Sequence, residues 1–422
     1  MKSVLVDDIF HLLQVFGDFQ IGLAMRTAGP LDRERLRKAL SALSGALPVL
    51  TMAFVPGRRR GRWKPHAAGD ELVAVELLRD GAAQVQDFFT RPVNPCTGPQ
   101  IKGLLLEGDV NYLCLNVSHF VADAAGVREL AYLLCRAYRS PDAIKPEHHD
   151  RGLDILLHQF PGRKKLGILR RTIEDIGSQL PFPPAVTLPG KRSNRFDRRY
   201  VIRQIGPDST ARLTALAAAY QATVNDVLMA AFIRSLAIFV PPGRRPAFRL
   251  VVTADLRRHL PPGLQAGQVR NLSGWVFADL GRDTGENLEA TCRRVSARMD
   301  RNKASCLGMG MIPLVWLAGR GLPQAAARAC LEKLAPKVLQ GLAVPPSFTN
   351  MGRLDPQALM FDGRPVEEAY LLPPVVHAPI LGVGVSRYRD TMTLSSGFNV
   401  PGFSADDVTA LLDGIAAEIH AA

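Results

Sequence analysis

The alternation of apolar and polar positions in the first half of the chain predicts a mixture of strands and helices. Strands are expected at residues 20–26, 49–55, 101–107 and 112–117, the last two paired across the turn Gly108-Asp109. Leucines at positions 36, 40, 43 and 47 lie on one face of an expected helix that Pro48 ends. A second helix is expected directly after residue 123.

The second half continues the same mixture. Strands are expected at residues 199–205, 249–254, 275–280, 347–350, 380–386 and 391–396, and helices at 209–220, 224–240 and 405–421. Thr223, followed three residues later by Asp226, predicts a capping box at the start of the second of these helices. This order of elements predicts an α/β or α+β fold.

The stretch from residue 140 to 199 is rich in proline and basic residues and holds one weak helix candidate near 166–180. A chain of 422 residues also exceeds what one core usually holds. We therefore expect two lobes, residues 1–180 and 195–422, with the boundary between residues 180 and 195.

Composition narrows the class of protein. A hydrophobic share of 47% with 22% charged residues is typical of a soluble globular chain. The six cysteines are scattered, without a CxxC pair or a Cys/His cluster, which predicts reduced thiols, no metal site and a cytoplasmic location. The N-terminus lacks the pattern of a secretory signal, and no run of about 18 apolar residues predicts a membrane span.

The net charge of +13 leaves three interpretations open. Basic residues cluster at 58–62, 163–165 and 191–199. Nucleic-acid binding is disfavoured, because only 7% of the residues are aromatic and no recognition motif accompanies the clusters. The others are a solvated basic surface and an anionic partner, such as coenzyme A phosphates or an acidic carrier protein.

One histidine stands in a context that suits chemistry. The chain has no GxxxxGK[ST], GxGxxG, GxSxG or HExxH motif, so phosphate-loop, dinucleotide, serine-hydrolase and zinc-protease chemistry are unsupported. His119 ends an expected strand, four residues before Asp123, and a helix follows at once. Such a junction holds an imidazole rigidly, although the residues alone also allow a core histidine. The doublet His148-His149 lies in the linker-like stretch, where a solvated loop is expected.

The segment Ser118-His119-xxx-Asp123-Ala124 resembles the HHxxxDG signature of the chloramphenicol acetyltransferase-like superfamily. This superfamily includes condensation domains, polyketide-associated acyltransferases, wax ester synthases and alcohol acyltransferases. Ser118 replaces the first histidine and Ala124 the glycine. Other resembling segments follow in the expected order, at residues 31–40, 98–99, 223–228, 255–257, 271–274 and 349–354. The resemblance implies two similar lobes in a V, with a tunnel at their junction.

The resemblance also implies roles for individual residues. His119 would act as the general base, and Asp123 would pair with Arg257 and shape the loop. Asp123 can also cap the following helix, a role compatible with that pair. Asn350 and Ser273 are candidates for the oxyanion site or the tunnel lining, while both can equally bond the backbone in turns.

The leading hypothesis is a monomeric, thioester-dependent acyltransferase that passes an acyl group to a small-molecule alcohol. Acyl-CoA or an acyl carrier protein with its phosphopantetheine would be the co-substrate, with no permanently bound cofactor, metal or nucleic acid. N-acylation of an amine or a peptide-type condensation is the alternative within enzymes. A condensation-like docking module that has lost catalysis is the alternative outside them.

Overall fold

The computed structural model describes residues 1–66, 73–77, 81–145, 151–153, 155–156, 160–179, 185–191, 197–240, 247–264, 268–282, 286–304, 306–310, 312–313, 323–341 and 344–421. Its strands are β1 (Gly17–Asp18), β2 (Gln20–Thr27), β3 (Met52–Val55), β4 (Arg62–Pro65), β5 (Val73–Leu77), β6 (Ile101–Glu107), β7 (Asn111–Ser118), β8 (Asp197–Ile205), β9 (Arg249–Asp255), β10 (Ser273–Asp279), β11 (Ser347–Leu354), β12 (Met360–Phe361), β13 (Arg364–Leu372), β14 (Val375–Val376), β15 (Gly382–Tyr388) and β16 (Thr391–Val400).

The helices of the same residues include all those expected from the apolar spacing. They are α1 (Leu5–Leu13), α2 (Arg33–Ala46), α3 (Gly81–Thr90), α4 (Ala124–Arg139), α6 (Gly162–Gln179), α7 (Pro207–Ala219), α8 (Val224–Ala237), α9 (Leu288–Ala304), α11 (Gln324–Gly341) and α12 (Ala405–Ala421). Short 3₁₀ helices cover Gln14–Phe16, Pro48–Thr51, Pro141–Ala143, Leu256–His259 and Pro262–Leu264.

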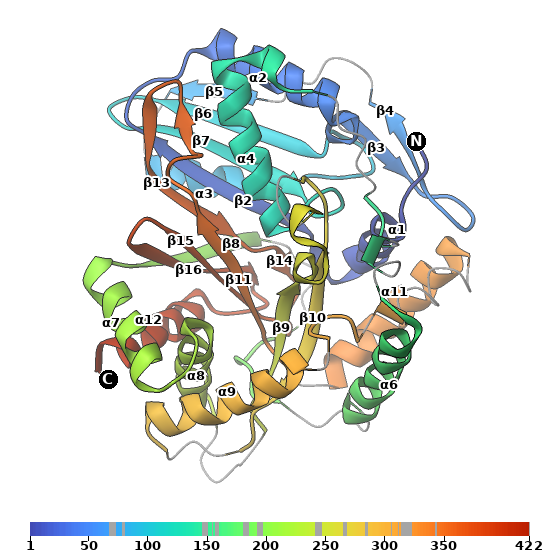
Figure 1. Cartoon of the computed structure of the whole chain (residues 1–422), viewed down its shortest axis with the longest axis vertical. Coiled ribbons are helices and arrows are strands. Elements are labelled where there is room, and N and C mark those ends of the chain that lie inside the picture. Colours follow the sequence, from blue (N-terminus) through green and yellow to red (C-terminus); the bar gives the residue numbers. More distant parts are fainter. Residues whose placement is uncertain are drawn as a thin grey trace.

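Two six-stranded sheets form the two lobes (Figure 1). The first has the order β12-β13-β2-β7-β6-β5, and the second the order β10-β9-β11-β15-β16-β8. Each sheet carries its own apolar core: the leucine face of α2 and the inner face of α4 pack on the first sheet, while α7, α8, α9 and α12 cover the second. The mixed fold and the two lobes predicted from the sequence are confirmed.

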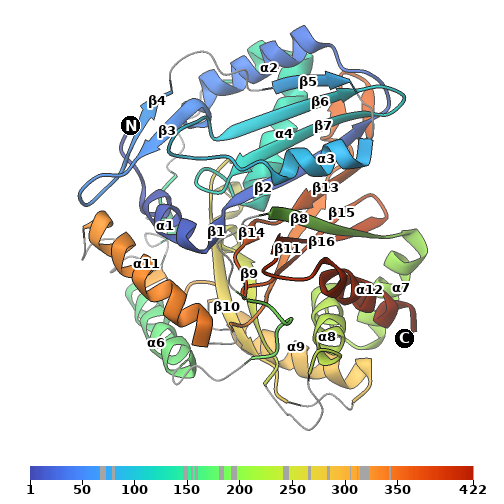
Figure 2. The same ribbon diagram turned by 180° about the vertical axis from the view of Figure 1, so that it is seen from behind.

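A helix also packs on the other face of the first sheet. Phe88 and Phe89 of α3 lie in one apolar cluster with Leu104 of β6 and Tyr200 of β8, a strand of the second sheet. Figure 2 shows α3 on this face, close to the junction of the lobes. The two sheets therefore meet through a buried apolar layer.

The division of the chain is less simple than a cut in the middle. Strands β12 and β13, from the second half, complete the first sheet, and β13 pairs antiparallel with β2, with Leu371 opposite Leu23. The predicted boundary between residues 180 and 195 stays a prediction, since residues 180–184 and 192–196 lie outside the described part.

Several predicted elements differ in their bounds. The strand expected from Val49 begins at Met52, because Pro48 opens a 3₁₀ turn over Pro48–Thr51. The helix candidate near 166–180 begins earlier, at Gly162, and Leu180 lies outside the described residues. The doublet His148-His149 also lies outside them. The capping box between Thr223 and Asp226 is present, with both reciprocal bonds formed.

Two further observations concern the general class of the protein. All six cysteines are free thiols. In the part of the chain that the structure covers, no single helix has the length and apolar character needed to cross a membrane. Helices α7 and α8 have that length and apolar character only when taken together, and they are bent by 102° relative to each other.

Candidate active site

The histidine motif lies where β7 leaves the first sheet and turns into α4. Ser118 is paired with Gln20 of β2, and the His119 N–H donates to the Phe19 carbonyl at 2.9 Å, which extends the ladder by one residue. The buried Ser118 hydroxyl accepts the N–H of Phe120 at 3.4 Å. Serine in place of the first motif histidine therefore supports the turn that presents His119.

Groups from distant parts of the sequence hold the His119 imidazole. Phe10 of α1 stacks on the ring, with centroids 4.5 Å apart and planes 21° apart. The Asn271 side-chain nitrogen donates to the His119 carbonyl at 2.5 Å and lies 3.0 Å from Nδ1. The Asn271 oxygen accepts the Ser273 N–H at 3.2 Å, which fixes the orientation of the amide. The ring is thus clamped from both halves of the chain.

This environment keeps the imidazole neutral. Burial lowers the pKa of His119 below its ordinary value, and the charge of Asp123 opposes that effect only in part. The ring also bonds its own backbone carbonyl. A neutral imidazole keeps a lone pair on one ring nitrogen, which is the form that a general base needs.

Asp123 ties the motif to the second half of the chain. One carboxylate oxygen accepts the Gly126 N–H at 2.8 Å, so Asp123 caps α4. The other accepts the Leu272 N–H and the Arg257 Nη1, each at 2.7 Å. The structure therefore brings the two predicted partners together, and the capping role coexists with the ion pair.

Arg257 is equally well held. Its Nη2 donates to the Arg270 carbonyl at 2.7 Å, and its backbone N–H donates to Asp255 at 2.9 Å. Burial would by itself raise the pKa of Asp123, but the guanidinium of Arg257 and the two backbone N–H groups outweigh it and hold that pKa below its usual range. The pair is therefore ionised at neutral pH and locks the motif loop against residues 270–272.

The start of α4 approaches that segment closely. A Cβ at Gly126 would lie 2.7 Å from the Arg270 carbonyl oxygen, which is backbone and cannot move aside cheaply. The superfamily signature has its glycine at the position of Ala124, whereas in this chain the close approach falls at Gly126. Ala124 is half-buried and lines the cavity described next.

A cavity of about 370 Å³ lies against the motif, within the range typical of small-ligand sites. Its lining includes Asp123, Ala124, Ser273, Asn350 and Arg258. The Asn350 amide donates to Asn225 at 2.7 Å, while its oxygen accepts the Gly352 N–H at 2.8 Å. Asn350 therefore lines the cavity with one of its two N–H donors already engaged.

Ser273, unlike Asn350, lines two hollows. It lines the cavity of about 370 Å³ and also a small apolar hollow of about 30 Å³, which Phe10, Val6, Trp275 and Ile312 line as well. In the described part of the structure its hydroxyl makes no hydrogen bond. Two hollows thus meet at Ser273, next to the residue pair Phe10 and Asn271 that holds His119.

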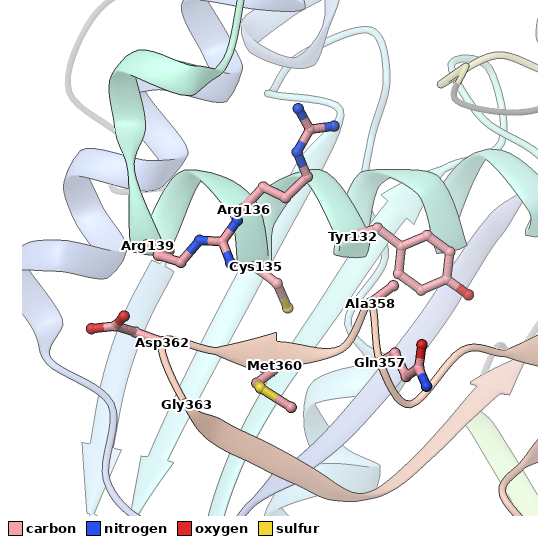
Figure 3. A pocket seen from close by; sticks show the side chains of 9 residues that line it. All are labelled: Tyr132, Cys135, Arg136, Arg139, Gln357, Ala358, Met360, Asp362 and Gly363. Atoms are coloured by element: carbon pink, nitrogen blue, oxygen red, sulfur yellow. The ribbon is translucent and has the colours of Figure 1, made fainter.

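Another hollow lies between α4 and the β12–β13 hairpin, and none of the predicted site residues line it. It measures about 170 Å³ (Figure 3). Tyr132, Cys135, Arg136 and Arg139 reach it from α4, and Gln357, Ala358, Met360, Asp362 and Gly363 from the β12–β13 hairpin and the turn before it. We assign this hollow no part in the site around His119.

Three supporting residues were not predicted from the sequence. Phe10 and Asn271 contact His119 directly, and Arg151 donates to the Phe120 carbonyl at 3.1 Å and to Asp7 of α1 at 2.7 Å. The segment containing Asn271 resembled a superfamily segment, so a signal existed for that residue. The described residues include no group of histidine, cysteine and acidic side chains that could hold a metal ion.

Comparisons with known sequences find one family and one curated relative. Residues 199–306 match the family described as phthiocerol/phthiodiolone dimycocerosyl transferase C-terminus. The chain is 26% identical over 380 residues to phenyloxazoline synthase MbtB of Mycolicibacterium paratuberculosis (strain ATCC BAA-968 / K-10), an alignment that covers 83% of this chain. The aligned part is 32% of that relative, so the chain spans about a third of its length.

Solved structures share the fold along almost the whole chain. The trichothecene 15-O-acetyltransferase TRI3 of Fusarium sporotrichioides has a TM-score of 0.75 at 13% identity, covering 99% of this chain and 94% of that one. The first condensation domain of the CDA synthetase scores 0.71 at 17% identity, covering 99% and 95%. Polyketide synthase associated protein 5 of Mycobacterium tuberculosis scores 0.68 at 14%, covering 99% and 98%. The chain therefore shares the two-lobed fold of these acyltransferase and condensation-domain structures, and residues 199–306 match one family of acyl-transferring proteins.

Proposed function

We propose that this protein transfers an acyl group from a thioester to a hydroxyl acceptor, with His119 as the general base. The observation that carries the proposal is a neutral imidazole, clamped by Phe10 and Asn271 from both halves of the chain. Asp123 and Ala124 of the same motif line a cavity large enough for a small substrate. Rigid placement of a base next to two bound reactants is what this reaction requires.

The reaction needs no covalent enzyme intermediate. The free ring nitrogen of His119 takes the proton of the acceptor hydroxyl as its oxygen forms a bond to the thioester carbonyl carbon. The tetrahedral intermediate then collapses, the carbon–sulfur bond breaks, and the proton passes from the imidazolium to the departing thiolate. Base catalysis of this kind contributes about 10²- to 10⁴-fold to the rate.

Ser273 is the better of the two oxyanion candidates. Its hydroxyl makes no bond in the described structure and lies where the two hollows meet. The Asn350 amide, in contrast, is held by Asn225 through one of its two N–H groups, which restricts where the other can point. A free hydroxyl can donate to a developing oxyanion without first breaking another bond.

The cavity lining also favours an anionic donor such as acyl-CoA or carrier-bound phosphopantetheine. Arg128 and Arg258 both line it, and the exposed Arg258 guanidinium pairs with no acidic group in the described part of the chain. Arginine is well suited to binding phosphate groups. The overall charge of +13 favours the approach of the same anions.

The test is a substrate panel. The purified protein is mixed with acyl-CoA thioesters of different chain length or with acyl carrier protein thioesters, and with alcohols or amines, while free thiol and acylated product are followed. Acceptor-dependent thiol release with an ester product supports the proposal. An amide product would assign the protein to N-acylation or peptide-type condensation, and no acceptor-dependent release from coenzyme A or carrier thioesters would favour the docking module.

A further inference from the structure

The outer face of α6 exposes a stripe of large apolar side chains. Leu166, Leu169 and Ile173 are 69%, 48% and 64% exposed. At about 100° per residue, these three positions fall within about 60° of one another around the helix axis. Other strongly exposed large apolar residues in the described structure stand singly on their elements: Met1, Val110, Ile238, Leu334 and Met360. Contiguous exposure of this kind marks an interaction surface.

The opposite face of α6 anchors the helix, so the stripe cannot turn inward. Ile168 and Thr172 are only 2% and 3% exposed. Ile168 packs in an apolar cluster with Val6 and Ile312, and the Thr172 hydroxyl bonds the Gly310 carbonyl. Val6 and Ile312 also line the small hollow beside Phe10. The helix therefore covers the Phe10 side of the site while its other face points to solvent.

Basic residues flank the stripe. On the same helical geometry, Lys165 and Arg170 lie about 40° beyond its two edges. Arg163 and Lys165 are exposed and pair with no acidic group among the described residues, while Arg170 bonds Glu174 at 2.9 Å. The helix holds five basic residues against two acidic ones, so its surroundings attract anions.

We propose that α6 binds the surface of an anionic phospholipid bilayer. The three apolar side chains would enter the boundary between headgroups and acyl chains, and the flanking cations would contact lipid phosphates, as in other helices that lie in the membrane interface. A second copy of the chain is a poorer partner, because docking two α6 faces would bring together unpaired cations of two chains that each carry +13. This inference does not depend on the proposed reaction.

Binding in this orientation has a consequence for access to the site. The cluster that holds α6 continues inward to the small hollow beside Phe10 and Ser273. A protein attached through α6 would keep that side of the site close to the lipid, where long-chain substrates dissolve.

The experiment uses the full chain and sedimentation with vesicles. Vesicles of phosphatidylcholine mixed with phosphatidylglycerol should bind the protein, and phosphatidylcholine alone should bind it weakly. Leu166→Ser/Leu169→Ser/Ile173→Ser should lower partitioning to the mixed vesicles by at least about tenfold, because burying these side chains supplies the apolar part of the binding. Arg163→Gln/Lys165→Gln should lower it about fivefold for each cation removed.

Ile238→Ser, at a residue 65% exposed on the second lobe, is the matched control and should bind vesicles like the wild-type protein. Equal sedimentation of the stripe variant and the wild type would overturn the proposal, as would absence of wild-type binding. Concentration-dependent self-association without lipid, abolished in the stripe variant, would assign the face to a second copy instead. Circular dichroism of each variant checks that the fold is retained.

Discussion

The buried pair between Asp123 and Arg257 gives the sharpest test of the fold around the site. Both side chains are almost fully buried, at 7% and 6% exposure, and they come from different halves of the chain. Arg257→Met removes the guanidinium while keeping an apolar stem of similar length. Asp123 then stays buried with only the Gly126 and Leu272 N–H groups as donors.

The expected cost can be estimated from these contacts. Removing one partner of a buried ion pair typically costs about 3–5 kcal/mol, because the other charge is left uncompensated. The N–H groups of Gly126 and Leu272 still bond Asp123 and reduce that cost. The Arg270 carbonyl, however, loses its hydrogen bond from Arg257 Nη2. We therefore expect a loss of about 3 kcal/mol in the free energy of unfolding at pH 7, toward the low end of that range.

The pH dependence of this loss has a defined sign. In the wild type the pKa of Asp123 is lowered, so its contribution to stability is present above the unfolded pKa and lost as the pH falls through the folded one. Without Arg257, burial dominates and raises the folded pKa of Asp123 above the unfolded value. In the variant, Asp123 therefore takes up a proton as the pH falls, and the cost of burying its unpaired charge disappears. The stability difference from wild type should shrink as the pH is lowered from 7 toward 4.

The assay is urea denaturation followed by circular dichroism, with a double-mutant cycle. Asp123→Asn/Arg257→Met removes both charges and should cost less than the sum of the single changes, by about 2 kcal/mol. Arg203→Met is the matched control, because its pair with Asp413 is solvent-exposed and should contribute less than about 1 kcal/mol. A coupling below about 0.5 kcal/mol, or a loss that grows in acid, would refute the reasoning.

Three further substitutions probe the site. Gly126→Ala places a Cβ 2.7 Å from a backbone carbonyl and should cost about 1–3 kcal/mol by thermal denaturation, whereas Gly45→Ala, with open space around it, should not destabilise the protein. Asn271→Ala removes the amide that holds His119 and should lower kcat by roughly ten- to a hundredfold with little change in KM; an unchanged kcat would contradict the positioning role. Arg258→Gln should raise KM for acyl-CoA severalfold at constant kcat, and an unchanged KM would remove Arg258 from donor binding.

Local pattern was enough to predict much of the fold. The last helix occupies residues 405–421, as predicted, because its apolar spacing and its bounds are both local features. Asp226 is similarly paired with Thr223 because capping involves residues only three apart. Strand β13 was not predicted: its partner β2 lies more than three hundred residues earlier, and no local signal encodes that pairing.

In the candidate site, too, local features could be predicted from the sequence and long-range contacts could not. His119 was singled out by its place at a strand end and by the resemblance, and its contact with Asn271 depends on chain segments about 150 residues apart. Phe10 lies on helix α1, which also contains Asp7 and Asp8. Two acidic residues in a row are typical of a solvent-exposed helix, but both side chains are buried here and bond to residues far away in the sequence. Sequence motifs thus pointed to His119, while the groups that orient its ring required the three-dimensional structure.

The pH profile of acyl transfer tests the role of His119 most directly. With a thioester and an acceptor found active in the substrate panel, thiol release is measured across acid to neutral pH for wild type and His119→Ala. The wild-type rate should fall only below the ordinary histidine pKa of about 6.5, because burial lowers the pKa of His119 and the base is lost when it is protonated. The variant should be about 10²- to 10⁴-fold slower and lack that acid limb. A variant that releases thiol at the wild-type rate, with the same pH profile, would contradict the assignment of His119 as the base.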